Sequence, residues 1–90
     1  MIALRCYDNG GKTYDRYTVL PARWVRGRSR RVAGGLLWEA IAASAQPFHP
    51  QGFGQHVEAM AGAHLGKRVP FETLPADVQR FARQSFTIEE

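Results

Sequence analysis

Two strand-like segments joined by an Asn-Gly turn limit most strongly what this chain can fold into. Ile2–Tyr7 alternates with a period of two, which is typical of a half-buried strand. Tyr14–Leu20 is rich in aromatic and β-branched residues, and Pro21 ends it. Between them, Asn9 and Gly10 form the strongest short hairpin signal. The sequence therefore predicts an N-terminal β-hairpin.

A two-stranded hairpin is marginal in water, so the chain needs a further strand or a cover. The Ala, Leu and Glu content of Leu36–Ser44 favours a helix, whereas its position between two glycines and Pro47 suits a third antiparallel strand. We favour the strand. Further along, Gly66–Phe71 is typical of a short edge strand, because Pro70 is tolerated only at an edge.

The C-terminal part predicts an amphipathic helix. Pro75 suits a first helical turn, and apolar residues then recur at helical spacing, with Arg80 and Arg83 pointing away. The buried stripe consists of Val78, Phe81, Ala82, Ser85 and Phe86. We expect an α+β fold: a small antiparallel β-meander, made of the hairpin plus a third strand, packed by this helix.

Length and cysteine content set the class of protein. Ninety residues predict one domain, 1–90, and the 44% of hydrophobic residues supply a modest core. Cys6 is the only cysteine, so no intramolecular disulfide can form. We find neither a signal peptide nor an apolar run of membrane-spanning length. These features predict a protein of the reducing cytoplasm that does not enter a membrane.

The positive charge is concentrated in one segment, Ala22–Gly35, which glycines flank and which we expect to be a loop. The net charge of the chain is +4, yet outside this cluster seven basic residues face eight acidic ones. Arginine binds phosphate and carboxylate through a planar fork, and a tryptophan adds a stacking surface. The alternative is a solvated loop that only aids solubility. The candidate partner-binding or nucleic-acid-binding residues are Arg23, Trp24, Arg26, Arg28, Arg30 and Arg31.

A second candidate surface is the segment Gln46–His56. Two prolines and two glycines predict a shaped loop without regular structure, with Phe48 and Phe53 packed inward. We expect Val57–His64, which follows it, to form a short helical turn. The loop either completes the core or presents a recognition surface made of His49, Gln51, Gln55 and His56.

Motifs for catalysis and metal binding are weak. The glycines before Lys12 resemble a phosphate loop, but Cys6 stands where its first glycine belongs and a strand follows instead of a helix. Three histidines, at positions 49, 56 and 64, match no metal-ligand spacing, and we expect His49 to hydrogen-bond within its own loop. Cys6 shares an apolar strand face and is expected in the core. We therefore predict no cofactor, no metal and no enzymatic activity, with a small His-dependent or metal enzyme as the remaining alternative.

Three stretches resemble a family of small proteins encoded by bacteriophages and plasmids. They are Tyr7–Thr13 with Asp15–Val19, then Pro47–Gln55, then His64–Arg68 with Leu74 and Pro75. The family carries no assigned activity, and the chain departs from it between Ala22 and Ala45, where the family has a shorter and less basic link. The resemblance implies a mobile-element accessory protein of the kind that binds and blocks a host machine, CRISPR–Cas complexes included.

These observations lead to a first hypothesis, a non-enzymatic protein that docks on a host protein or protein–nucleic acid complex as an anti-defence inhibitor. The alternative is direct nucleic-acid binding through the arginine-rich segment. An edge strand could also pair with a second copy, so the sequence leaves a homodimer open.

Overall fold

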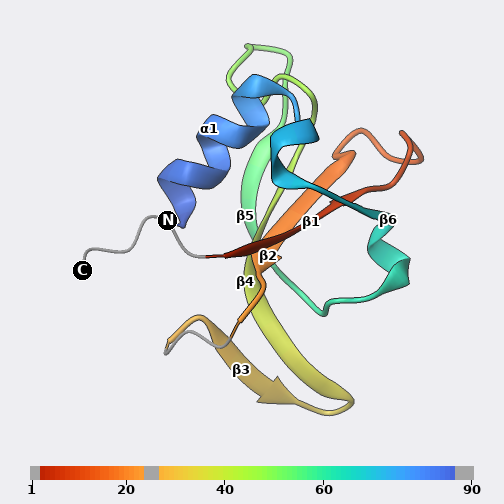
Figure 1. The fold of residues 1–90 in the computed structure, drawn as a ribbon, viewed down its shortest axis with the longest axis vertical. Helices are drawn as coiled ribbons and strands as arrows, with labels where there is room; N and C mark the ends of the chain where they lie inside the picture. The colour runs from red at the N-terminus through yellow and green to blue at the C-terminus, as the bar shows by residue number, and fades with distance from the viewer. Residues whose placement is uncertain (1–2, 24–26, 87–90) are drawn as a thin grey trace.

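The computed structural model describes residues 3–23 and 27–86. These residues form an α+β fold of one antiparallel sheet and one C-terminal helix (Figure 1). The elements are β1 (Leu4–Asp8), β2 (Tyr17–Pro21), β3 (Ser29–Val32), β4 (Gly35–Ala43), β5 (Gly54–Ala59), η1 (Ala63–Leu65), β6 (Lys67–Val69), η2 (Phe71–Thr73) and α1 (Ala76–Ser85). Among the described residues, no helix is long and apolar enough to cross a membrane.

The N-terminal hairpin forms as expected, but its connection is longer than a two-residue turn. Asp8 lies opposite Tyr17, and the backbone N–H of Asn9 donates to the carbonyl of Arg16 at 3.0 Å. Residues 14–16, expected in the second strand, therefore belong to the connection. Gly10 and Gly11 adopt positive φ in this turn, with values of 77° and 87°.

β4 is the longest strand of the sheet that the described residues form, and it organises the rest. Residues 35–43, which the sequence left between strand and helix, pair with β2, β3 and β5. Trp38 lies opposite both Ser29 and Ala59, and Ile41 opposite both Val19 and His56. Because β5 occupies one edge of β4, β2 and β3 must share the other edge.

β2 and β3 pair with the same edge of β4, and their registers show that residues 22–28 are extra relative to one continuous strand along that edge. Continuing the β2 register, with Val19 opposite Ile41, would place Ala22 opposite Trp38, but Ser29 stands there. β2 pairs with β4 as far as Val19, and the chain meets β4 again at Arg28, whose carbonyl accepts from the N–H of Glu39. We call residues 22–28 the insertion, and Ser29–Trp38 the basic hairpin.

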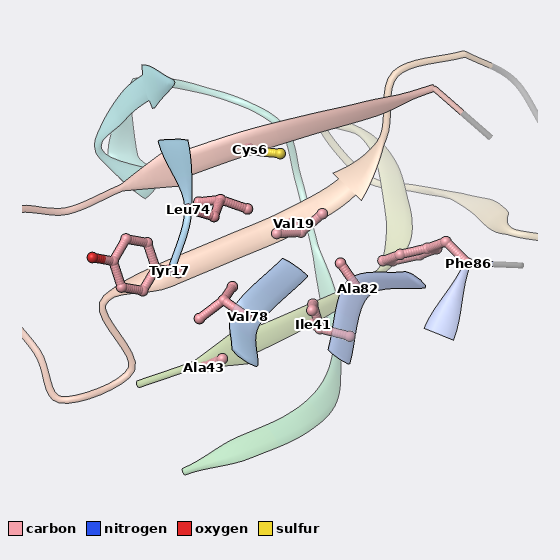
Figure 2. Close-up of a cluster of buried hydrophobic side chains, with 9 residues drawn as sticks. All are labelled: Cys6, Tyr17, Val19, Ile41, Ala43, Leu74, Val78, Ala82 and Phe86. Carbon is pink, nitrogen blue, oxygen red and sulfur yellow. The ribbon is translucent and has the colours of Figure 1, made fainter. Parts of the chain in front are cut away.

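The helix covers one face of the sheet and creates the main core (Figure 2). Cys6, Val19 and Ile41 meet Val78 and Phe86 there, all at most 1% exposed. The expected amphipathic stripe is thus the buried face of α1, although Phe81 is only half-buried.

A smaller cluster lies on the opposite face of the sheet. Tyr7, Leu20 and Trp38 are buried there, and Ala61 and Leu65 from the β5–β6 connection pack on them. Residues 57–64 were expected as a helical turn. Instead β5 runs to Ala59, and a 3₁₀ turn follows at residues 63–65.

Candidate binding surface

The arginine cluster is not the loop that the sequence predicts, because its second half is strand β3. Val32 lies opposite Gly35, so Ala33 and Gly34 form a two-residue turn. Gly34 has a φ of 92°, which the turn requires and which glycine adopts without strain. The glycines expected as loop breakers therefore mark a hairpin turn. In Figure 1, β3 and the first half of β4 extend away from α1 and the other strands.

Two arginines of the cluster are held by glutamates of neighbouring strands. Arg28 donates from one nitrogen to Glu39 at 3.2 Å and to the backbone carbonyl of Ser85, at the end of α1, at 3.1 Å. Arg30 donates to both oxygens of Glu58, at 2.8 and 3.0 Å. The hydrogen bond from Arg30 lowers the pKa of Glu58. Arg28 and Arg30, two of the candidate binding residues, are therefore both engaged in ion pairs within the molecule.

These ion pairs explain an otherwise unfavourable register. Glu39 and Glu58 lie directly opposite each other on β4 and β5. Like charges at such positions repel. Arg28 and Arg30 supply the compensating charge, and both lie at or beside the base of the basic hairpin. The two pairs thus tie the hairpin and the insertion to β4, β5 and the helix end.

Two further arginines of the cluster, Arg23 and Arg31, lie within the described residues. Arg23 and Arg31 are exposed, and within the described residues neither makes a salt bridge. Arg23 belongs to the insertion and Arg31 to β3. Trp24 and Arg26, also predicted for this surface, lie outside the described residues.

The second predicted surface does not exist as one loop. His49 and Gln51 are exposed in the turn, but Gln55 and His56 are part of β5. Adjacent strand residues point to opposite faces, so Gln55 and His56 cannot share a surface. The ladder begins earlier than expected because the backbone N–H of Ser44 donates to Phe53 at 2.8 Å. His49 bonds within its own loop, as predicted, since its Nδ1 accepts from the N–H of Gln51 at 3.1 Å.

The loop also presents an aromatic group that the sequence placed inside. Phe48 is 43% exposed, and the guanidinium carbon of Arg80 lies 4.2 Å from its ring centroid. Phe81 contacts both Phe48 and His56 edge-on, at 6.0 and 5.6 Å between ring centroids. Helical spacing correctly predicted that Arg80 points away from the core. The spacing could not show that Phe48, from a loop distant in the sequence, would contact Arg80.

A cleft of about 510 Å³ lies at the C-terminal end of α1. Within it, Nε2 of His56 lies 3.1 Å from the hydroxyl of Ser85, the separation of a nucleophile and its base. A helix C-terminus presents carbonyl groups and negative potential, which oppose an oxyanion at Ser85. The lining residues are Arg28, Glu39, Ala40, His56, Val57, Glu58, Ser85 and Phe86.

The glycine turn after β1 is internally saturated. The N–H of Gly10 donates to Asp8 at 2.8 Å, and those of Gly11 and Lys12 donate to the side-chain oxygen of Asn9 at 2.9 and 3.1 Å. A phosphate loop needs such N–H groups free. This turn therefore has no backbone donors at these positions to offer an anion.

Cys6 is 1% exposed, and burial raises the pKa of its thiol to about 11. The thiol is thus protonated at neutral pH, which agrees with the expected core position. In the part of the chain that the structure describes, no three histidine, cysteine or acidic residues gather to hold a metal ion.

Comparison of the chain with family models, curated proteins and solved structures found no match.

Proposed function

We propose that this chain is a binding protein that docks on a nucleic-acid-handling assembly of its host through the basic hairpin and the insertion. The proposal rests on one observation, the difference between the ion-paired and the unpaired arginines of the cluster. Arg28 and Arg30 bind glutamates of neighbouring strands, while Arg23 and Arg31 are exposed and make no salt bridge within the described residues. An element fixed in the free protein loses less entropy when it binds.

Among the described residues of the cluster, the number of unpaired arginines favours a protein or protein–nucleic acid partner over naked nucleic acid. Two arginines neutralise about two phosphates, so affinity for DNA would fall only about tenfold between 50 and 200 mM salt. Proteins that rely on phosphate contacts make about six to ten of them. Two guanidinium forks suit a local contact with carboxylates or a few phosphates, in which each fork contributes specificity.

The anti-defence role comes from the resemblance to phage and plasmid proteins. Inhibitors of CRISPR–Cas complexes and similar machines need no catalytic site, only a surface that occupies a functional contact of the target. The cytoplasm of the host cell is then the place of action. Inhibition of a purified defence complex by this protein, with loss of inhibition on charge reversal at Arg23 and Arg31, is the expected behaviour.

The test is capture of partners from host lysate with wild-type protein and with the double variant Arg23→Glu/Arg31→Glu. We expect the wild type to recover a nucleic-acid-handling protein and the variant to lose it. Arg68→Glu is the matched control, because Arg68 is an exposed arginine on β6, distant from β3 in the sheet order. Recovery of no such protein, or equal recovery by both variants, contradicts the proposal.

Direct nucleic-acid binding is the second candidate, and the shape of the basic hairpin favours it. A two-stranded ribbon fits the major groove of DNA. This function requires binding in the absence of any host protein, reduced by Arg23→Ala/Arg31→Ala and by salt. Absence of binding at low ionic strength would exclude it.

A further inference from the structure

β5 presents a free backbone edge that is ready to pair. Among the described strands it pairs only with β4. The carbonyl of Phe53 accepts from β4, so the peptide groups of residues 55, 57 and 59 also face β4. Those of Gly54, His56 and Glu58 consequently point outward, where no described strand meets them.

The other free edges of the described sheet carry features that prevent pairing. β6 spans only Lys67–Val69 and is followed directly by Pro70, which has no N–H to donate. β3 carries Arg30 and Arg31, which would bring guanidinium groups together if two copies met there. β5 has neither a proline nor a run of like charge.

We propose that two copies of the chain pair through β5 in an antiparallel, two-fold symmetric register centred on Val57. In a continuous sheet, opposed residues share a face, so the register sum must be even. The register centred on Val57 sets each His56 opposite Glu58 of the second copy. It also sets Gln55 opposite Ala59 of the second copy, and Val57 opposite itself. The outward peptide groups of residues 56 and 58 then bond to each other across the dyad.

The side chains at these positions have the capacity to make the contact. Nε2 of His56 faces Ser85, which leaves Nδ1 for a partner. The side chain of Glu58 is 48% exposed even with Arg30 bound, so its carboxylate can accept a further hydrogen bond. The two-fold symmetry repeats the contact between His56 and Glu58, so the dimer contains it twice.

The helices leave room for this arrangement. The body of α1 packs over Val19 and Ile41, on β2 and β4 (Figure 2). Of its side chains, Phe81 and Ser85 reach His56 on β5. With strands about 4.8 Å apart, helices lying over the two copies of β4 would stand at least about 14 Å apart. Packed helices need only about 8–10 Å. The joined sheet therefore forms without a helix clash.

The test is the oligomeric state of purified protein by sedimentation equilibrium. We expect a monomer–dimer equilibrium with a Kd on the order of 10–100 µM, since an edge of six residues buries less than a standard interface. His56→Glu sets glutamates against each other, and Glu58→Lys sets lysine against His56. Each variant alone should dimerise at least about tenfold more weakly.

Mixing the two variants gives the decisive result. In a mixed dimer, the glutamate introduced at position 56 of one copy faces the lysine introduced at position 58 of the other. The second pair keeps the native Glu58 opposite the native His56, so an equimolar mixture should regain wild-type association, read by native mass spectrometry. Lys67→Glu, a charge reversal on the β6 edge, should leave the dimer unchanged. In the wild type, amide exchange at residues 54, 56 and 58 should slow as concentration rises.

A wild type that stays monomeric at several times the expected Kd overturns the proposal. So does a dimer that survives both single variants, because it must use another surface. Failure of the mixture to associate while both variants remain folded by circular dichroism overturns the register centred on Val57. These outcomes are independent of the proposed docking function, which partner capture tests.

Discussion

The helix-covered body and the basic hairpin of this molecule are held in place by different forces. β2, in the body, buries four of its five residues, whereas β3 buries none of its four. Burial of apolar surface stabilises the body. β3 is positioned by backbone pairing with β4 and by glutamates that bind Arg28 and Arg30. We therefore expect the body to stay folded when the charged side chains of β3 are replaced.

Among these variants, Phe86→Ala should lower the free energy of unfolding the most. A small loss would show that apolar burial does not hold the body together. Phe86 is 1% exposed and belongs to the core under α1. Loss of a buried phenylalanine costs about 3–5 kcal/mol, a large share of the stability of a small domain. Urea denaturation measures it. Phe48→Ala is the matched control, because the same truncation at a 43% exposed side chain should cost far less.

Arg28→Ala should have an intermediate effect, because Arg28 joins the two regions. It is 25% exposed, donates to Glu39 and to the Ser85 carbonyl, and lies 5.7 Å from the ring of Phe86. Loss of charged hydrogen bonds in this setting costs about 1–2 kcal/mol. Amide exchange should also accelerate in β3 more than in β2.

Arg30→Ala is the control for that experiment. Its ion pair with Glu58 is solvent-exposed on both sides, and such pairs contribute little to the free energy of unfolding. If Arg30→Ala destabilised the protein as much as Arg28→Ala, the contacts of Arg28 with the end of α1 would add nothing to the free energy of unfolding.

The body could be predicted from local patterns, and the hairpin could not. Val78, Ala82 and Phe86 repeat at helical spacing, and Tyr7 with Cys6 shows the period of a strand. β3 has four residues, two of them arginines, and no apolar alternation, so its strand state depends on pairing with β4. A short sequence window contains no information on such pairing.

The candidate site could not be predicted for the same reason, because its ion pairs depend on contacts between strands that are distant in the sequence. Glu39 and Glu58 are nineteen residues apart and meet only because β5 pairs with β4 in one register. Without that register, no pattern connects them to Arg28 and Arg30. The density of prolines and glycines before Gly54 also extended the predicted loop over residues that form β5. Gly54 belongs to the strand through its pairing with Ala43, and a glycine fits there because Phe81 lies 3.0 Å from the position that a Cβ would take.

Arg23→Ala/Arg31→Ala should change stability by no more than about 0.5 kcal/mol, since both side chains are exposed and unpaired within the described residues. The proposed docking function requires that the same variant lose its partner. Thermal unfolding and partner capture on one preparation measure both. A clear loss of stability would show that these arginines also support the fold, and would end the separation between the two regions.

Acid should produce the smallest effect, a local loss of the ion pair between Arg30 and Glu58. The hydrogen bond from Arg30 lowers the pKa of Glu58 below its ordinary value of 4.5. A carboxyl with a lowered folded-state pKa contributes fully above that ordinary value, and the contribution disappears as the pH falls through the lowered pKa. Amide shifts of Arg30 and Arg31, followed by NMR from neutral to acid pH, should move in this window while those of Val19 and Ile41 stay constant. Glu58→Gln should abolish the transition. A transition shared by Val19 and Ile41 would mean that acid opens the body and the hairpin together.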